Sequence, residues 1–271
     1  MRIMILASSL YSERALAVLV SLCSAGHKPV ACVCVKTIHL QNIRRKLAQY
    51  GWRDFLGYAW RRLRPPIAGK DSPSRTASSL FADWLKAHGV EVSNLSQACR
   101  HYGIPLRLVS DVNQPAVLEF LRRSNPDLIV YTGGGILRPP LLAIPRKGVL
   151  NGHAGLLPRY RGMNVVEWAL LEGNEIGVTV HFIDSGIDTG AIVLTKAVTP
   201  AIQDTSLSAL SQRIVYITVD ALVEAVRQLA KEEAGEMRQP AGGGKQYFVM
   251  HEKLRSLAEQ QLTDRRNRYS A

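Results

Sequence analysis

An amide, an imidazole and a carboxylate occur in two motifs of the chain that could form one polar site. Asn151 and His153 are two residues apart and follow the apolar run Gly148-Val149-Leu150, so in an extended segment both side chains project to the same side. Asp188 lies in a glycine-flanked turn after an alternating, strand-like segment from Val178 to Ile183. A carboxylate on such a loop can approach an imidazole on the neighbouring strand, raise its pKa and fix its orientation. These residue types predict acid/base chemistry.

Longer motifs surround these three residues. Taken singly, a His or Asp in such a loop is more often a helix cap or a satisfied polar group. Here the trio accompanies Leu-Leu-Pro-Arg-Tyr-Arg-Gly at 156–162, Gly-Val-Thr-Val-His-Phe-Ile at 177–183 and Gly-Ile-Asp-Thr-Gly at 186–190. Over about residues 125–195 the chain closely resembles the formyltransferases that use 10-formyltetrahydrofolate, which include glycinamide ribonucleotide formyltransferase, methionyl-tRNA formyltransferase and nucleotide-sugar N-formyltransferases. By this resemblance, Asn151, His153 and Asp188 are the catalytic trio.

The implied reaction explains why such a trio is needed. When an amine attacks a formyl carbon, negative charge develops on the carbonyl oxygen and positive charge on the nitrogen. The carboxamide of Asn151 and a protonated His153 would stabilise the oxygen, and losing one such donor typically slows a reaction about a hundredfold to a thousandfold. Asp188 would keep His153 cationic and relay the ammonium proton, directly or through water, to the departing folate nitrogen.

Two loops are candidates for holding the folate. The glycine-rich stretch 132–140 allows close approach of the backbone to a flat ligand, although an ordinary strand-to-helix turn would look the same. The resemblance implies that two groups of residues, one from each loop, hold the pterin. These residues are Gly135, Ile136 and Leu137, together with Asp184, Ser185, Gly186 and Ile187. We therefore expect 10-formyltetrahydrofolate as co-substrate, bound where both loops open at one sheet edge.

The first turn of the chain yields further candidates. Residues 7–12 contain neither Gly-x-Gly-x-x-Gly nor a P-loop, so nothing supports binding of NAD or ATP. In glycinamide ribonucleotide formyltransferase the equivalent turn is glycine-rich and holds the substrate phosphate, and the departure here argues against purine synthesis. Candidate acceptor-binding residues are Ser8, Ser9 and Tyr11 in this turn and Arg159 and Arg161 in the motif at 156–162.

The hydrophobic periodicity predicts an α/β fold. Strands are expected at 2–7, 29–35, 90–95, 106–109, 128–131 and 178–183, and helices at 12–25, about 78–88, 114–123 and 207–231. Residues 238–249 look like a turn and a short strand, and 252–271 like a terminal helix or a charged tail. This order predicts a Rossmann-like, mostly parallel sheet flanked by helices. We expect a catalytic domain at 1–200, with a helical insertion at about 38–88, and a C-terminal helix with a short extension at 201–271.

The insertion is strongly basic. Residues 41–75 contain nine Lys and Arg and two Asp, which is a net +7 of the +12 of the whole chain. Aromatic residues interleave with these charges at roughly helical spacing. Three interpretations stay open: a solvated helical face packed by its aromatics, a lid that attracts phosphates, or a contact with membrane or nucleic acid.

Composition sets broader limits. Hydrophobic residues make up 46% of the 271 residues, no apolar run reaches the roughly 20 residues of a membrane span, and no signal-peptide pattern opens the chain. We therefore expect a cytoplasmic globular protein without a transmembrane segment. The four cysteines include Cys32 and Cys34 in an apolar run, so we interpret these two as buried strand residues and expect no metal site.

The acceptor is the least determined part of the sequence analysis. About seventy residues follow Ala201, which leaves little room for the second domain of methionyl-tRNA formyltransferases. We therefore favour a small, phosphate-bearing amine, above all a nucleotide-linked amino sugar, over initiator tRNA and glycinamide ribonucleotide, although nonspecific nucleic-acid contact stays open. Other hypotheses are a hydrolase that releases formate from the same folate, a noncatalytic folate-binding protein, and an enzyme with a different acyl donor. A homodimer is compatible with each of them.

Overall fold

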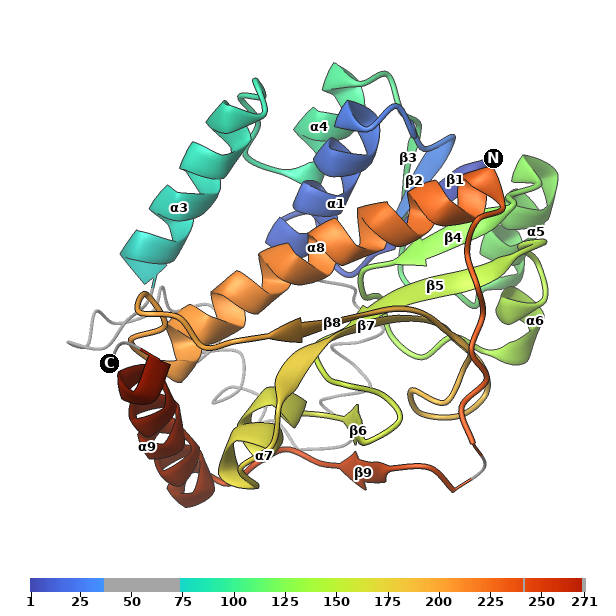
Figure 1. Ribbon diagram of the computed structural model, residues 1–271. Helices are drawn as coiled ribbons and strands as arrows, with labels where there is room; N and C mark the ends of the chain where they lie inside the picture. Colours follow the sequence, from blue (N-terminus) through green and yellow to red (C-terminus); the bar gives the residue numbers. More distant parts are fainter. Residues whose placement is uncertain (37–73, 241, 270–271) are drawn as a thin grey trace, which may run out of the picture.

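A seven-stranded sheet forms the centre of the computed structural model, which describes residues 1–36, 74–240 and 242–269 (Figure 1). The strand order is β3-β2-β1-β4-β5-β7-β8. The first five strands are parallel, whereas β7 runs antiparallel to both of its neighbours. The strands are β1 (Ile3–Ala7), β2 (Ala31–Val35), β3 (Leu106–Val109), β4 (Leu128–Tyr131), β5 (Gly148–His153), β7 (Ile176–Phe182) and β8 (Ile192–Val198). The predicted mostly parallel sheet is therefore confirmed.

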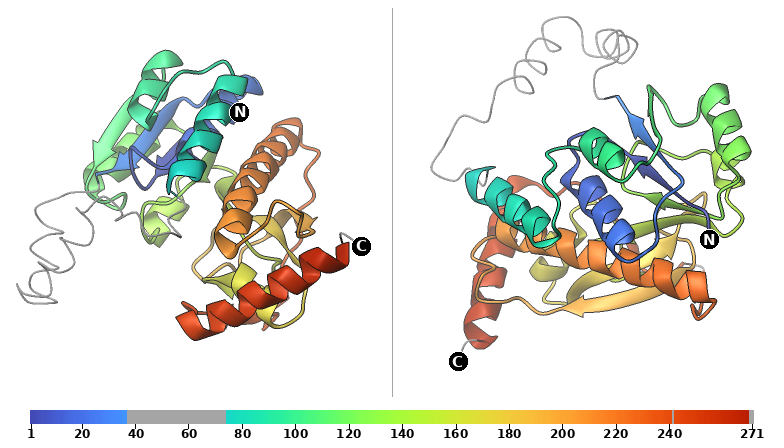
Figure 2. Two further views of the ribbon diagram at one scale, coloured as in Figure 1. Left: turned by 90° about the vertical axis from the view of Figure 1, so that its left-hand side faces the viewer. Right: turned by 90° about the horizontal axis from the view of Figure 1, so that it is seen from above.

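Helices cover both faces of this sheet. Helices α1 (Glu13–Ser24) and α8 (Leu207–Lys231) lie beside one another on one face, and α5 (Pro115–Ser124) and α6 (Pro139–Leu142) lie on the other (Figures 1 and 2). Alternate residues of β1 belong to different core clusters, with Ile5 on the α1 and α8 side and Leu6 on the α5 and α6 side. Both faces are buried, which explains why the central strands read as continuous apolar runs.

A small second sheet and two further helices lie beside the main sheet. Strand β6 (Tyr160–Gly162) pairs in parallel with β9 (Lys245–Tyr247), and α9 (Glu252–Tyr269) packs against α7 (Val165–Leu171). Helices α3 (Ser74–Ala87) and α4 (Leu95–His101) lie on the same side of the main sheet as α1 (Figure 1). In the described part of the chain, no helix is long and apolar enough to cross a membrane.

Most predicted elements are present with nearly the expected bounds. The βαβ opening, α3, α5, α8, the strands at 106–109 and 128–131, and a helix rather than a charged tail at the C-terminus are all found. Cys32 and Cys34 are buried in β2 as expected. The basic segment 41–75 lies almost wholly outside the described residues, so its role stays a prediction, as does the division into domains.

The strand predicted at 90–95 is wrong. The structure has no strand there; instead, the side chain of Asn94 accepts a hydrogen bond from the Gln97 N–H and caps α4, which starts at Leu95. The alternation of Val90 and Val92 with polar residues was too short to separate a strand from the approach to a capped helix. The sequence analysis also left β6, β8 and α7 unassigned.

Close packing between α8 and β5 depends on Gly152, the residue between Asn151 and His153. A Cβ atom at this position would lie 2.5 Å from Thr218 Cγ2 and 3.1 Å from the Leu222 side chain. The absence of a side chain therefore allows the helix to rest directly on the strand that carries the two polar residues.

We expect Gly152→Ala to lower the free energy of unfolding by about 1–3 kcal/mol, because overpacking would force helix and strand apart. Urea denaturation measures this loss. Gly235→Ala is the matched control, because nothing lies within 4 Å of a Cβ there. Equal stability of the two variants would show that the helix does not depend on this contact.

Candidate active site

Four polar side chains meet where β5 and β7 lie side by side. The antiparallel register places Asn151 opposite His181 and His153 opposite Thr179. Asn151 Nδ2 lies 3.1 Å from His181 Nε2, while the two Asp188 carboxylate oxygens lie 3.5 Å from His181 Nε2 and 3.5 Å from His153 Nδ1. The structure thus brings the predicted trio together and adds His181 to it.

From the sequence alone, His181 is one member of an alternating strand and is not distinguished as a site residue. It is 1% exposed, and its Nδ1–H donates to the carbonyl of Phe182 at 2.8 Å. In that tautomer Nε2 can accept a hydrogen bond from the Asn151 carboxamide, which fixes the orientation of the amide. Its position opposite Asn151 follows from strand pairing, which no local pattern reveals.

Asp188 is held in an uncommon backbone conformation. Its φ of 54° lies in the left-handed region, which is unfavourable for a residue other than glycine and persists only where surrounding contacts impose it. The Asp184 carboxylate accepts hydrogen bonds from the Gly186 N–H and the Thr189 hydroxyl within the same loop. The Gly162 N–H of β6 donates to Asp188 Oδ2 at 2.8 Å, so a second element fixes the carboxylate itself.

His153 is oriented from its other side. Its Nε2–H donates to the carbonyl of Tyr160 at 2.8 Å, which leaves Nδ1 turned towards Asp188. The residue is 7% exposed. A Cβ atom on Gly155 would lie 2.8 Å from Nε2, so the loop after β5 packs tightly over the ring.

Burial and charge act in opposite directions on this pair. Burial lowers the pKa of His153, the nearby His181 and Arg14 also lower it, and together they outweigh the raising effects of Asp188 and the Tyr160 carbonyl. Burial would raise the pKa of Asp188, but the adjacent imidazoles of His181 and His153 in their protonated forms, together with the Gly162 N–H, keep it below its ordinary value. The expectation that Asp188 keeps His153 cationic is therefore wrong for the resting site: desolvation favours neutral imidazole beside an ionised carboxylate.

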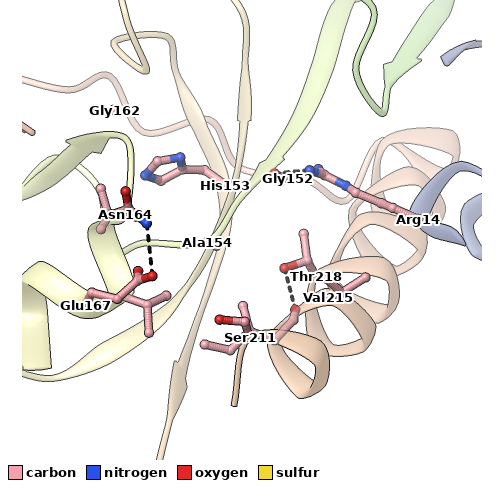
Figure 3. A pocket seen from close by; sticks show the side chains of 13 residues that line it. Arg14, Gly152, His153, Ala154, Gly162, Asn164, Glu167, Ser211, Val215 and Thr218 are labelled. Carbon is pink, nitrogen blue, oxygen red and sulfur yellow. Dashed lines mark hydrogen bonds between the residues drawn. The ribbon is translucent and has the colours of Figure 1, made fainter. Parts of the chain in front are cut away.

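A cavity of about 310 Å³ opens beside His153 (Figure 3). Arg14 of α1 approaches it from one side, Asn164 and Glu167 from the α7 side, and Ser211 and Thr218 from α8 (Figure 3). Glu167 is 6% exposed. Its carboxylate accepts a hydrogen bond from the Asn164 amide at 2.9 Å and lies 3.8 Å from the Arg255 guanidinium.

Arg14 is the cationic group of the cavity, and the sequence analysis did not single it out. Its Nη2 donates to the Gly152 carbonyl at 2.5 Å, between Asn151 and His153. Its buried Nε has no hydrogen-bond partner within the described residues, and burial lowers its pKa. A guanidinium that is desolvated without a carboxylate partner can be compensated by an anionic ligand.

The predicted folate loops lie on one side of the sheet. Leu137 and Ile183, which precedes the second loop, pack against the same core cluster. Tyr131 OH donates to the Gly135 carbonyl at 2.7 Å, and the Asn113 amide donates to the Ile136 carbonyl at 2.9 Å. The side chains of Ile136 and Ile187 are 86% and 53% exposed. Their role in folate binding stays a prediction.

None of the five predicted acceptor residues lines the cavity. Ser8 packs against Gly133, and Tyr11 is 77% exposed. The Arg159 guanidinium lies 5.6 Å from the centre of the Tyr160 ring, and Arg161 donates to the Gly244 carbonyl at 3.1 Å. Ser9 accepts a hydrogen bond from the Tyr11 N–H. Their acceptor role remains a prediction, and Arg14 on the following helix is the better-placed group.

The depressed pKa of His153 implies a pH-dependent stability. The unfolded chain takes up this proton near pH 6.5, about the ordinary pKa of histidine, whereas the folded chain resists it. The free energy of unfolding should therefore fall below about pH 6.5, and Asp188 adds to the loss only at lower pH. Protonation of His153 in the unfolded chain occurs between about pH 7 and 5. Over this range, urea denaturation should show a steeper fall in the free energy of unfolding for wild type than for His153→Asn. His101→Asn, at an exposed position, should keep the wild-type slope; parallel curves for wild type and His153→Asn would contradict this assignment.

Comparison with known proteins places the sequence in a family. The family model described as formyl transferase matches residues 87–226. Methionyl-tRNA formyltransferase of Chlorobium chlorochromatii (strain CaD3) is 33% identical over 169 residues, which cover 62% of this chain and 51% of that protein. The corresponding enzyme of Citrifermentans bemidjiense is 40% identical over 134 residues, or 49% and 42% of the two chains. The chain spans about half the length of the curated relatives it matches.

Solved structures share the fold at low sequence identity. Glycinamide ribonucleotide transformylase 1 from Symbiobacterium toebii has a TM-score of 0.55 at 22% identity and covers 86% of this chain and 89% of its own. A sugar N-formyltransferase from Shewanella sp FDAARGOS_354 has a TM-score of 0.54 at 14% identity, with 97% and 87% covered. Because the family match spans more than half of the sequence, the chain belongs to the formyl transferase family.

Proposed function

We propose that this protein is an N-formyltransferase that moves the formyl group of 10-formyltetrahydrofolate to the primary amine of a small acceptor. The observation that carries the proposal is the cluster of Asn151, His153, His181 and Asp188, set in a chain of the formyl transferase family. The cluster contains an amide donor, two imidazoles and a carboxylate whose polar atoms lie 3.1–3.5 Å from one another. Formyl transfer to an amine needs such donors and proton acceptors.

Each residue of the cluster has a distinct task in this proposal. One amide hydrogen of Asn151 is directed to His181, and the other is free to donate to the formyl oxygen as negative charge develops there. Neutral His153 and ionised Asp188 together take up the proton of the attacking amine. The positive charge that His153 gains stabilises the negative charge on the formyl oxygen, and the pair then passes the proton to the departing folate nitrogen.

The residues of the two predicted folate loops fit a flat, partly apolar ring. Ile136 and Ile187 expose apolar side chains, and no atom lies within 4 Å of a Cβ placed on Gly135, so the backbone there is accessible. Pockets for such ligands combine apolar walls with a few backbone hydrogen-bonding groups. When bound, 10-formyltetrahydrofolate supplies the activated formyl carbon.

The cavity supports a small acceptor that carries an anionic group. Its volume of about 310 Å³ lies near the lower end of ligand pockets, about 300–1,000 Å³. Arg14 offers a positive charge for which no carboxylate partner is seen among residues 1–36, 74–240 and 242–269, and the buried carboxylate of Glu167 can receive hydrogen bonds from hydroxyl or ammonium groups. A nucleotide-linked amino sugar combines phosphates, hydroxyls and a primary amine, and we favour it as the acceptor class.

Methionyl-tRNA is the second candidate acceptor. The observation in its favour is that the curated relatives at 33% and 40% identity are methionyl-tRNA formyltransferases. A phosphate-rich acceptor would also satisfy Arg14. The two candidates differ in size, so a direct comparison of acceptors separates them.

The test is to incubate purified protein with 10-formyltetrahydrofolate and, separately, nucleotide-linked amino sugars or methionyl-tRNA, and to follow tetrahydrofolate release and the formylated product. We expect release that requires an amino sugar and that falls at least about a hundredfold in His153→Ala. His101→Ala serves as the control at an exposed histidine.

An acceptor-side variant extends the same assay. Arg14→Met should raise the KM of an anionic acceptor about tenfold or more, because a hydrogen bond to a charged group is lost, with tetrahydrofolate binding unchanged. Release that needs methionyl-tRNA would select the second candidate. Release without any amine would indicate a hydrolase, and failure to bind the folate would overturn the proposal.

A further inference from the structure

We propose that a C-terminal strap, residues 237–250, positions Asp188, and that Gln239 is the positioning residue. The strap is described except for residue 241. This inference rests on the proposed function, because it concerns the geometry of the same cluster. The strap lies beyond α8 in the sequence and crosses the edge of the site formed by the Asp188 loop and β6.

The side chain of Gln239 is hydrogen-bonded to the backbone of the Asp188 loop. Its Nε2 donates to the carbonyl of Asp188 at 3.0 Å and to the carbonyl of Gly190 at 2.7 Å, so a single amide group holds both sides of Thr189. Asp188 has a left-handed φ of 54°. This conformation needs an external restraint, and the Gln239 amide supplies one directly at the residue concerned.

Neighbouring contacts hold Gln239 itself in place. Met237 and Ile192 exchange two backbone hydrogen bonds, of 2.8 and 2.9 Å, at the start of β8. On the opposite side of the loop, a Cβ atom on Gly190 would lie 1.9 Å from the Phe182 carbonyl oxygen. The loop is thus confined between the strap and the end of β7, and it has little room to relax if the amide is lost.

The strap also holds in place the backbone N–H of Gly162, which donates to the Asp188 carboxylate. Strand β9 pairs with β6, and the Met163 N–H donates to the Tyr247 carbonyl at 3.0 Å. The preceding residue, Gly162, donates its own N–H to Asp188 Oδ2. Gln239 fixes the backbone of Asp188 and β9 fixes the donor to its side chain, so one segment sets both.

His153 is linked to the strap by a shorter route. Tyr247 OH and Tyr160 OH both donate to the Glu172 carboxylate, at 2.8 Å each, and the two rings stack with centroids 5.2 Å apart. The carbonyl of Tyr160 receives the Nε2–H of His153. The strap therefore supports both partners of the His153–Asp188 pair.

Loss of the Gln239 amide should change how Asp188 titrates. The groups that face this carboxylate are His153 of β5, His181 of β7 and the Gly162 N–H of β6, and together they hold its pKa below the ordinary value. A loop that relaxes away from them would bind a proton more readily. The acidic limb of the kcat profile should then move to higher pH, an effect that a loss of global stability alone does not produce.

The test compares Gln239→Met, which keeps the chain length but has no donor, with Arg238→Ala at the exposed neighbouring position. We expect Gln239→Met to lower kcat about tenfold to a hundredfold, the scale of a small misplacement of a reacting group. The KM of the folate co-substrate should change less than about twofold, within the spread of replicate assays, and the acidic limb should shift upwards. Arg238→Ala should match wild type. Should Gln239→Met not fold, Gln239→Asn, one methylene shorter, provides the same comparison.

A titration of the imidazole signals of His153 and His181 by NMR keeps this test separate from the proposed function. If wild type transfers no formyl group, the proposed function fails, and the inference is still judged by whether Gln239→Met alters the titration of these two imidazoles. Altered titration together with the kcat loss supports the strap as a positioning device. The inference would be overturned if Gln239→Met kept the wild-type kcat per folded molecule, the wild-type acidic limb of the kcat profile and the wild-type imidazole titrations. Gln239 would then have a purely structural role.

Discussion

A buried carboxylate between two imidazoles is the constraint on which the site depends. The side chain of Asp188 is 17% exposed, and burial by itself would favour its neutral form. Groups from three strands surround the carboxylate: His153 of β5, His181 of β7 and the Gly162 N–H of β6. These groups come from separate strands, so the site exists only when the sheet, the small β6–β9 pair and the loop are assembled together.

The antiparallel strand β7 follows from the same constraint. Its reversed direction places His181 opposite Asn151, and the loop that follows β7 brings Asp188 against both His181 and His153. At Gly152 the backbone of β5 lies directly against α8, and at Gly190 the loop lies directly against the end of β7. A side chain at either position would collide with the neighbouring element. Small residues at these points allow polar groups from distant segments to come within hydrogen-bonding distance.

Local patterns predicted much of this architecture, and the family resemblance pointed to Asn151, His153 and Asp188, which the structure brings together. The apolar runs gave the central strands, the long repeat at 207–231 gave α8, and the spacing of Asn151 and His153 placed both on one strand. Contacts between distant residues could not be derived in this way. Arg14 meets Gly152 across 138 residues and Gln239 meets Asp188 across 51, and neither side chain stands in a distinctive motif. The state of His153 was misjudged for a related reason, because the degree of burial depends on the assembled fold.

Formyl transfer in this account depends on the ionised Asp188 carboxylate, which together with His153 takes up the proton of the attacking amine. Single-turnover transfer by Asp188→Asn, measured across pH with the acceptor that wild type uses, tests it most directly, because the amide keeps the size of the side chain but removes its basicity. The account predicts a loss of about a hundredfold or more at every pH, with tetrahydrofolate still bound. Wild-type rates at every pH would contradict it.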